Sequence, residues 1–202
     1  NVISVHAVNK QPSSRWYSGS GIYRDVKLSV TDKVHVAKYG TTITSPKLEE
    51  QQNGAVDTLV KSRIVNQDDQ AHSIYAEYEI VDQNGQVVSE KVRSEVQSVL
   101  AGQEINLSHT LHVENPTLWD VKTNNPALYT LYTRVYRDSQ LVDVQKERFG
   151  YRYLNWTPEG GFFLNGAATK FHGVSLHHDH GALGAEENYK AEYRRLKQMK
   201  DM

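Results

Sequence analysis

Apolar and polar residues alternate with a period of two through the middle of this chain. A first alternating set is Ile74, Ala76, Tyr78 and Ile80, and a second is Tyr129, Leu131, Thr133 and Val135. A period of two predicts strands with one buried face. Strands are expected at 34–45, 56–66, 72–82, 86–99, 104–113, 128–137 and 140–148. Seven short strands separated by turns are typical of an immunoglobulin-like β-sandwich, here without its Cys–Trp–Cys core.

Three dipeptides predict tight turns between strands. Asn84-Gly85 is the strongest signal, because a type I′ hairpin turn needs positive φ at both central residues. Asp138-Ser139 is a weaker signal of the same kind. Asn165-Gly166 predicts a further hairpin, with residues 162–164 on one side and 170–171 on the other.

The pattern changes after residue 150. Val174 is expected in a short buried strand, followed by a loop from Leu176 to Asn188. From Tyr189 the apolar residues recur at helical spacing, which predicts an amphipathic helix capped by Asn188 or Glu187. A strand, a polar loop and a helix predict one β/α unit, with chemistry at the carboxyl end of its strand.

The first 30 residues hold two short apolar segments and a Gly-rich run between them. They are too short to fold alone, and we expect them to be the last strands of a preceding domain. An Arg24–Asp25 ion pair is expected there as a feature of the architecture. The predicted domains are therefore residues 1–32, 33–150 and 151–202.

Charge and composition exclude several classes of function. The chain has 202 residues, a net charge of −1 and no Cys. No excess of positive charge favours a nucleic-acid partner, and no apolar run of about 20 residues predicts a membrane span. Absence of Cys excludes disulfides and thiolate sites, and fits a bacterial protein of the cytoplasm, the cell surface or the medium. The chain begins with Asn1, so we expect it to be a piece of a longer protein.

The densest polar cluster is His177-His178-Asp179-His180, and it has three interpretations: a metal site, a structural loop or a substrate-binding loop. A metal site is the least favoured, because adjacent residues cannot all converge on one metal ion and the helical spacing of zinc ligands is missing. The side chains either hydrogen-bond the backbone at a strand end, or contact a substrate there. Glu186 and Glu187 are expected to favour the positive end of the following helix rather than to react.

Five segments, in their order and spacing, resemble glycoside hydrolase family 2, and within it the β-galactosidases. They are Arg15 to Val26, Val113 to Trp119, Asn125 to Tyr129, Arg148 to Arg152, and Gly161 to Gly184. The resemblance implies a mainly β chain: the end of a jelly-roll sugar-binding domain, an immunoglobulin-like sandwich, and the start of a TIM barrel.

The resemblance also implies a sugar-contacting loop. His177 falls on the position of the His that reaches the glycone in similar enzymes, and His178 and Asp179 match the His-His-Asp form of that loop. This form is more similar to β-galactosidases than to β-glucuronidases or β-mannosidases. The chain departs from the family at Ser175-Leu176, where Asn-Arg is common, and at His180, where an apolar residue is common.

The implied activity is that of a retaining hydrolase of terminal β-linked sugars. The family's two catalytic Glu residues come from later barrel strands, so the chain alone is expected to be inactive. No cofactor is expected in this chain. A divalent metal in the longer protein and self-association are both left open. A rival interpretation is a non-catalytic module that binds carbohydrate or protein through Tyr and Trp. A closer alternative is another substrate specificity of the same family, that of a β-glucuronidase or a β-mannosidase.

Overall fold

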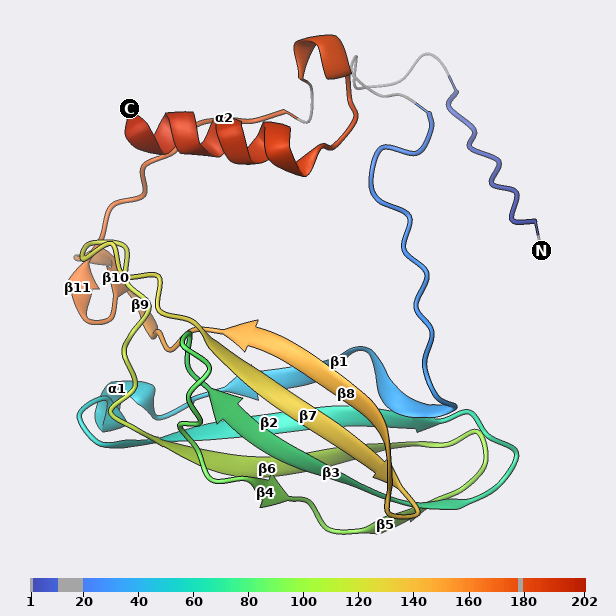
Figure 1. Cartoon of the computed structure of the whole chain (residues 1–202). Helices are drawn as coiled ribbons and strands as arrows, with labels where there is room; N and C mark the ends of the chain where they lie inside the picture. The colour runs from blue at the N-terminus through green and yellow to red at the C-terminus, as the bar shows by residue number, and fades with distance from the viewer. Residues whose placement is uncertain (1, 11–19, 178–179) are drawn as a thin grey trace. The chain divides into compact units, whose positions relative to one another are not determined.

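The computed structural model describes residues 2–10, 20–177 and 180–202. Within these ranges the chain forms two compact units. Residues 30–171 make one unit, and the described parts of 1–29 and 172–202 make the other. The larger unit is built from antiparallel strands (Figure 1), which confirms that the chain is mainly β.

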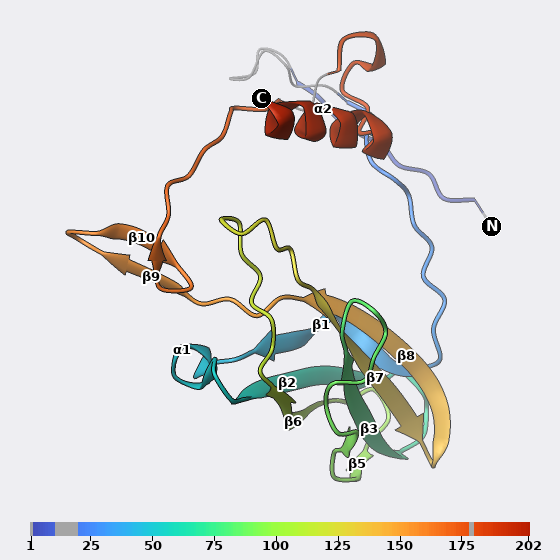
Figure 2. The same ribbon diagram turned by 60° about the vertical axis from the view of Figure 1, so that its left-hand side comes forward.

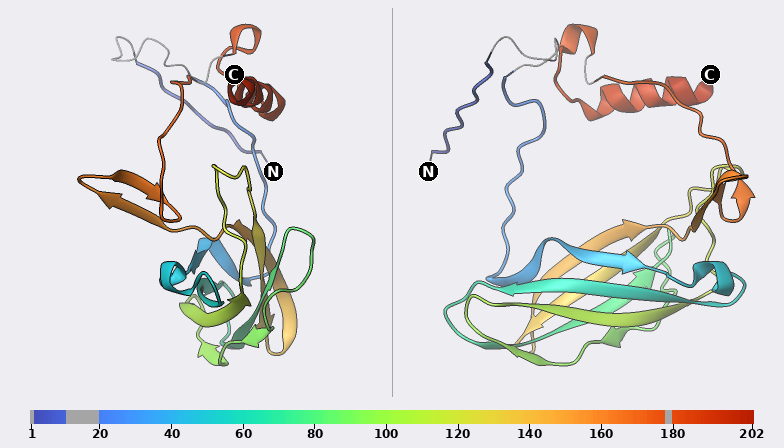
Figure 3. Two further views of the ribbon diagram at one scale, coloured as in Figure 1. Left: turned by 90° about the vertical axis from the view of Figure 1, so that its left-hand side faces the viewer. Right: turned by 180° about the vertical axis from the view of Figure 1, so that it is seen from behind.

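Two antiparallel sheets face each other in the larger unit. One sheet has the order β1-β2-β6, from Val34–Thr44, Ala55–Asn66 and Glu104–Glu114. The other has the order β4-β3-β7-β8, with β5 also paired to β3. Its strands are Val92–Arg93 (β4), His72–Val81 (β3), Tyr129–Arg137 (β7), Gln140–Phe149 (β8) and Gln97–Val99 (β5). The end-on view of Figure 3 shows the two layers of this sandwich.

The core lies between the sheets, and the period of two places it there. Ile74, Ala76, Tyr78 and Ile80 are fully buried on β3, as the alternation predicts. On β7 the buried set is Tyr129, Leu131, Thr133 and Val135. Burial of apolar area is the dominant force that holds such sheets together.

The turns follow the predicted positions but not all of the predicted types. Asp138 and Ser139 both have positive φ, at 50° and 69°, so the weaker signal forms the two-residue turn. At Asn84-Gly85 only Gly85 has positive φ. There the Asp82 carboxylate accepts from the N–H groups of Asn84 at 2.8 Å and Gln86 at 2.9 Å, which stabilises a longer loop.

Some expectations about elements were wrong, and one element was not foreseen. Residues 86–99 form two short strands rather than one, and a four-residue helix, α1 (Leu48–Gln51), was not foreseen. No strand forms in the described residues before Val34, and Val174 is 63% exposed outside any strand. A strand needs a hydrogen-bonded neighbour, and the part of the chain that the structure describes provides none at these places.

A small three-stranded sheet completes the larger unit. Its order is β11-β10-β9, from Ala167–Ala168, Gly161–Leu164 and Leu154–Thr157. Asn165-Gly166 forms the predicted turn, with φ of 50° and 76°. The strand after this turn is β11, not residues 170–171. Figure 2 shows the β9–β10 hairpin from the side.

In the described part of the smaller unit there is a 3₁₀ turn, Gly181–Leu183, and a helix, α2 (Tyr189–Asp201). Asn188 caps α2, as predicted: its Oδ1 accepts from the N–H groups of Lys190 at 3.1 Å and Ala191 at 3.3 Å. Among the described residues, no helix combines the length and the apolar character needed to cross a membrane.

Candidate functional site

The candidate site is the loop that precedes α2 in the smaller unit. Of its three predicted sugar contacts, the structure describes His177, whereas His178 and Asp179 lie outside the described residues. His177 is exposed, and its backbone carbonyl accepts a hydrogen bond from Nη2 of Arg195 at 3.1 Å. An exposed imidazole next to a fixed backbone is suited to donate and accept hydrogen bonds with a polyol.

Among the described residues of this loop, His180 has the most enclosed polar side chain, with 6% of it exposed. Its Nε2 lies 2.7 Å from Oε1 of Glu192, and its Nδ1 lies 3.3 Å from Nη1 of Arg195. Arg195 also lies 3.7 Å from the Glu192 carboxylate, one helical turn away. The loop is therefore tied to α2 by side chains from two positions on one helix face.

These two helix residues escaped the sequence analysis, which predicted an amphipathic helix but no role for its polar side chains. One signal pointed to them. A His stands at position 180 where an apolar residue is common, and a buried imidazole needs hydrogen-bond partners. Acidic and basic residues three apart on the next helix are the nearest source of such partners.

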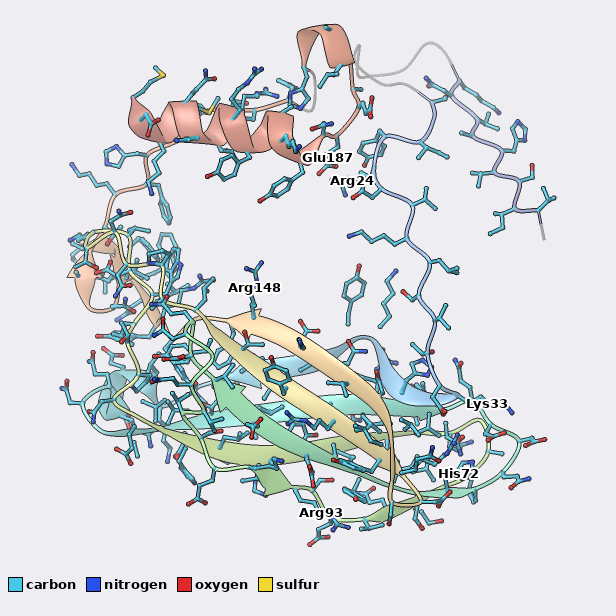
Figure 4. The ribbon with its side chains drawn as sticks, viewed as in Figure 1. Arg24, Lys33, His72, Arg93, Arg148 and Glu187 are labelled. Atoms are coloured by element: carbon cyan, nitrogen blue, oxygen red, sulfur yellow. The ribbon has the colours of Figure 1, made fainter. Side chains whose placement is uncertain are left out.

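A second link joins the loop to the N-terminal part of the smaller unit. Arg24 pairs with Glu187 at 2.5 Å, and the Glu187 N–H donates to the Tyr23 carbonyl at 2.8 Å (Figure 4). This hydrogen bond raises the pKa of Arg24. The expected Arg24–Asp25 pair is thus replaced by a pair with Glu187, which stands next to the N-cap residue Asn188.

A hollow of about 500 Å³ lies beside the loop. It is lined by His180, Ala182, Leu183, Ala191, Arg194 and Arg195. The lining combines apolar surface with two guanidinium groups. Among the described residues, no group of three His, Asp or Glu side chains is arranged to hold a metal ion.

The larger unit carries a junction between its sandwich and its hairpin. Asn165 donates from Nδ2 to the Trp119 carbonyl at 3.0 Å and accepts from the Tyr153 N–H at 3.1 Å. Arg152 lies over the Trp119 ring, 4.9 Å from its centroid. Next to this junction, Tyr151 is buried and its hydroxyl lies 2.8 Å from that of Thr58 on β2.

Two surface features of the larger unit lie near the same end. Trp156 and Phe171, which are 64% and 72% exposed, flank Phe162 at ring distances of 4.5 and 4.6 Å. A cleft of about 790 Å³ runs between the end of β1 and residues 148–152. Arg148, labelled in Figure 4, lies at its edge.

Comparison with known proteins identifies the family. Residues 34–152 match the family model for glycosyl hydrolases family 2. A β-galactosidase of Bacteroides ovatus is 40% identical over all of this chain and 23% of its own length. A β-glucuronidase of Bacteroides fragilis is 29% identical over 81% of this chain and 23% of its own length.

Solved structures agree with this result. A family 2 glycosyl hydrolase of Bacteroides cellulosilyticus superposes with a TM-score of 0.83 at 31% identity, over 95% of this chain and 25% of its own. The chain thus spans about a quarter of the length of these relatives. With more than half of its residues matched by the family model, the chain belongs to glycosyl hydrolases family 2.

Proposed function

We propose that these residues form the supporting part of a retaining β-glycosidase whose preferred substrates carry a terminal β-galactose. The observation that carries this proposal is the 40% identity to a β-galactosidase across the whole chain, loop and helix included. The His177-His178-Asp179 sequence supports the same class, because it has the form of the β-galactosidase loop.

The proposed layout follows the domains expected from the sequence. Residues 1–32 end a jelly-roll domain, residues 33–150 form an immunoglobulin-like sandwich, and residues 151–202 begin a TIM barrel. The two facing antiparallel sheets, β1-β2-β6 and β4-β3-β7-β8, support the second assignment, since that fold is also built from two packed antiparallel sheets. The loop-then-helix order of residues 177–201 supports the third.

In this proposal the reaction proceeds by double displacement at the anomeric carbon. One Glu attacks to form a glycosyl-enzyme, while a second protonates the leaving oxygen and then activates water. Both Glu residues belong to later barrel strands. The part assigned to this chain is binding: His177 hydrogen-bonds the glycone and favours its distortion toward the transition state.

A β-glucuronidase specificity is the second candidate. It is favoured by relatives of that name, including the one from Bacteroides fragilis. Glucuronic acid differs from galactose by the carboxylate at C6 and by the configuration at C4, so a glucuronidase site needs a cationic or amide group facing that carboxylate. The substrate panel below separates the two.

The test compares hydrolysis of aryl β-galactoside, β-glucuronide and β-mannoside. The 202-residue chain is assayed beside a longer form that continues through a complete barrel. We expect no turnover by the chain and galactoside turnover by the longer form. His177→Ala in the longer form is expected to lower kcat/KM by about 100-fold or more, the loss of a hydrogen bond that strengthens in the transition state.

A matched control is His112→Ala, a 65% exposed His of β6 in the sandwich, which is expected to leave activity unchanged. Faster cleavage of the glucuronide than of the galactoside would reassign the substrate. Cleavage of none of the three would favour the binding-module interpretation, in which the exposed rings of Trp156 and Phe171 are the first surface to test with glycans.

A further inference from the structure

His180 and Glu192 occupy places that two apolar side chains could fill without the cost of desolvating polar groups. The His180 side chain is 6% exposed, and Glu192 and Arg195 are only 28% and 25% exposed. Replacing a buried ionic network by apolar side chains is often neutral or stabilising. Such a network is therefore better explained by the geometry that it imposes than by the stability that it adds.

The hydrogen bonds fix the protonation pattern of the His180 ring. A guanidinium only donates, so Nδ1 of His180 must accept from Nη1 of Arg195. The ring proton then resides on Nε2 and is donated to Oε1 of Glu192. Glu192 thus holds one tautomer and one ring orientation, and that ring presents an acceptor to Arg195.

Arg195 links His180 to the backbone of His177. Nη1 binds the His180 ring, while Nη2 of the same planar group binds the backbone carbonyl of His177 at 3.1 Å. The two nitrogens of one rigid fork therefore set the separation between residues 177 and 180. Lys could not replace Arg195 here, because its single ammonium lacks the fork.

We propose that Glu192, His180 and Arg195 are positioning residues that hold the backbone of His177, so that its imidazole is presented to the sugar. The proposal rests on the glycosidase function proposed above. The three residues touch no sugar themselves: they act through the carbonyl of His177.

The first test is independent of activity. Ring-nitrogen NMR of the 202-residue chain, with His180→Leu used for assignment, is expected to show His180 as the Nε2–H tautomer, and Glu192→Leu is expected to abolish that preference. An Nδ1–H tautomer, or an average of both in the unaltered chain, would overturn the proposal, whatever the longer form hydrolyses.

The second test uses kinetics in the longer form. Glu192→Leu and Arg195→Lys are each expected to lower kcat/KM about tenfold, with kcat falling as well as KM rising. The double change His180→Leu with Glu192→Leu is expected to be as impaired as Glu192→Leu alone, because both variants break the same hydrogen-bonded network.

The double variant tests whether His180 and Glu192 act as one unit. If its loss of activity is the sum of the losses of His180→Leu and Glu192→Leu, the two residues act separately and the positioning role is refuted. Full activity of Arg195→Lys would also refute it. A longer form without glycosidase activity would refute the proposed function. The NMR result would still decide whether Glu192 and Arg195 hold the His180 ring in one tautomer.

Discussion

Replacing Tyr151 by Phe tests how the segment after β8 is fastened to the sandwich. Tyr151 is 1% exposed, and its hydroxyl lies 2.8 Å from that of Thr58, which is fully buried on β2. Its ring packs edge-to-face against Tyr129 at 4.9 Å and Phe149 at 5.2 Å. Burial raises the pKa of Tyr151, so the hydroxyl stays protonated at any pH of interest.

The magnitude follows from what each change leaves behind. Tyr151→Phe keeps the ring contacts and removes one buried hydrogen bond, which costs about 1–1.5 kcal/mol. Thr58 retains only the Ser45 hydroxyl at 3.5 Å, the outer limit for such a bond. We therefore expect a loss of about 1.5 kcal/mol, or roughly 4–6 °C in the unfolding midpoint of a unit of this size.

The assay is urea and thermal unfolding of the 202-residue chain, followed by far-ultraviolet circular dichroism. Tyr39→Phe is the matched control: Tyr39 is 92% exposed, and its change is expected to cost less than about 0.5 kcal/mol. Thr58→Val and the double variant complete a cycle. Since the double change removes both partners, its cost is expected to be about 1 kcal/mol less than the sum of the single changes. Strict additivity would refute the Tyr151–Thr58 bond as the fastening.

Three further predictions concern stability. Asn66→Ala is expected to cost about 2–3 kcal/mol by urea unfolding, because the buried Asn66 amide donates to three backbone carbonyls at 2.8–3.2 Å; a loss below about 1 kcal/mol would contradict this. Asp138 raises the pKa of His72, so the stability that His72 adds relative to His72→Gln is complete below its unfolded pKa and is lost as pH rises through the folded value. Unfolding at pH 5.5 and 8.5 checks it, and an equal difference at both would count against it. Residues 30–171 alone are expected to unfold with the midpoint of the whole chain, since every buried apolar residue among those described lies between Val34 and Leu164; failure of this piece to fold would show that the smaller unit supports the core.

The sandwich could be predicted from the sequence because its signal is local. The alternation at 74–80 and at 129–135 specifies which face is buried, and Asn188 marks the start of α2 through its own side chain. The ends of the chain could not be predicted in the same way. The segment around Val174 has the composition of a buried strand. A strand forms only beside a hydrogen-bonded partner, however, and composition does not show whether such a partner is present.

The candidate site shows the same division. His177 was found by its place in a motif, whereas the contacts of His180 with Glu192 and Arg195 join residues 12 and 15 positions apart. The pairing of Arg24 with Glu187 joins residues 163 positions apart. Periodicity carries no information on such pairs, because it reports which face a residue occupies and not which residue lies opposite.

The Asn165-Gly166 turn also has a consequence for the chemical ageing of the protein. Asn followed by Gly is prone to deamidation, because the unhindered Gly nitrogen attacks the Asn side chain to form a succinimide. Here the side-chain nitrogen Nδ2 of Asn165, which deamidation removes, is the donor to the Trp119 carbonyl, so its loss would set a carboxylate against a carbonyl oxygen. The left-handed backbone and both hydrogen bonds of Asn165 hold its amide in place while the turn is intact. The rate at which Asn165 deamidates, and with it the lifetime of the contact to Trp119, is thus set by how often this turn opens.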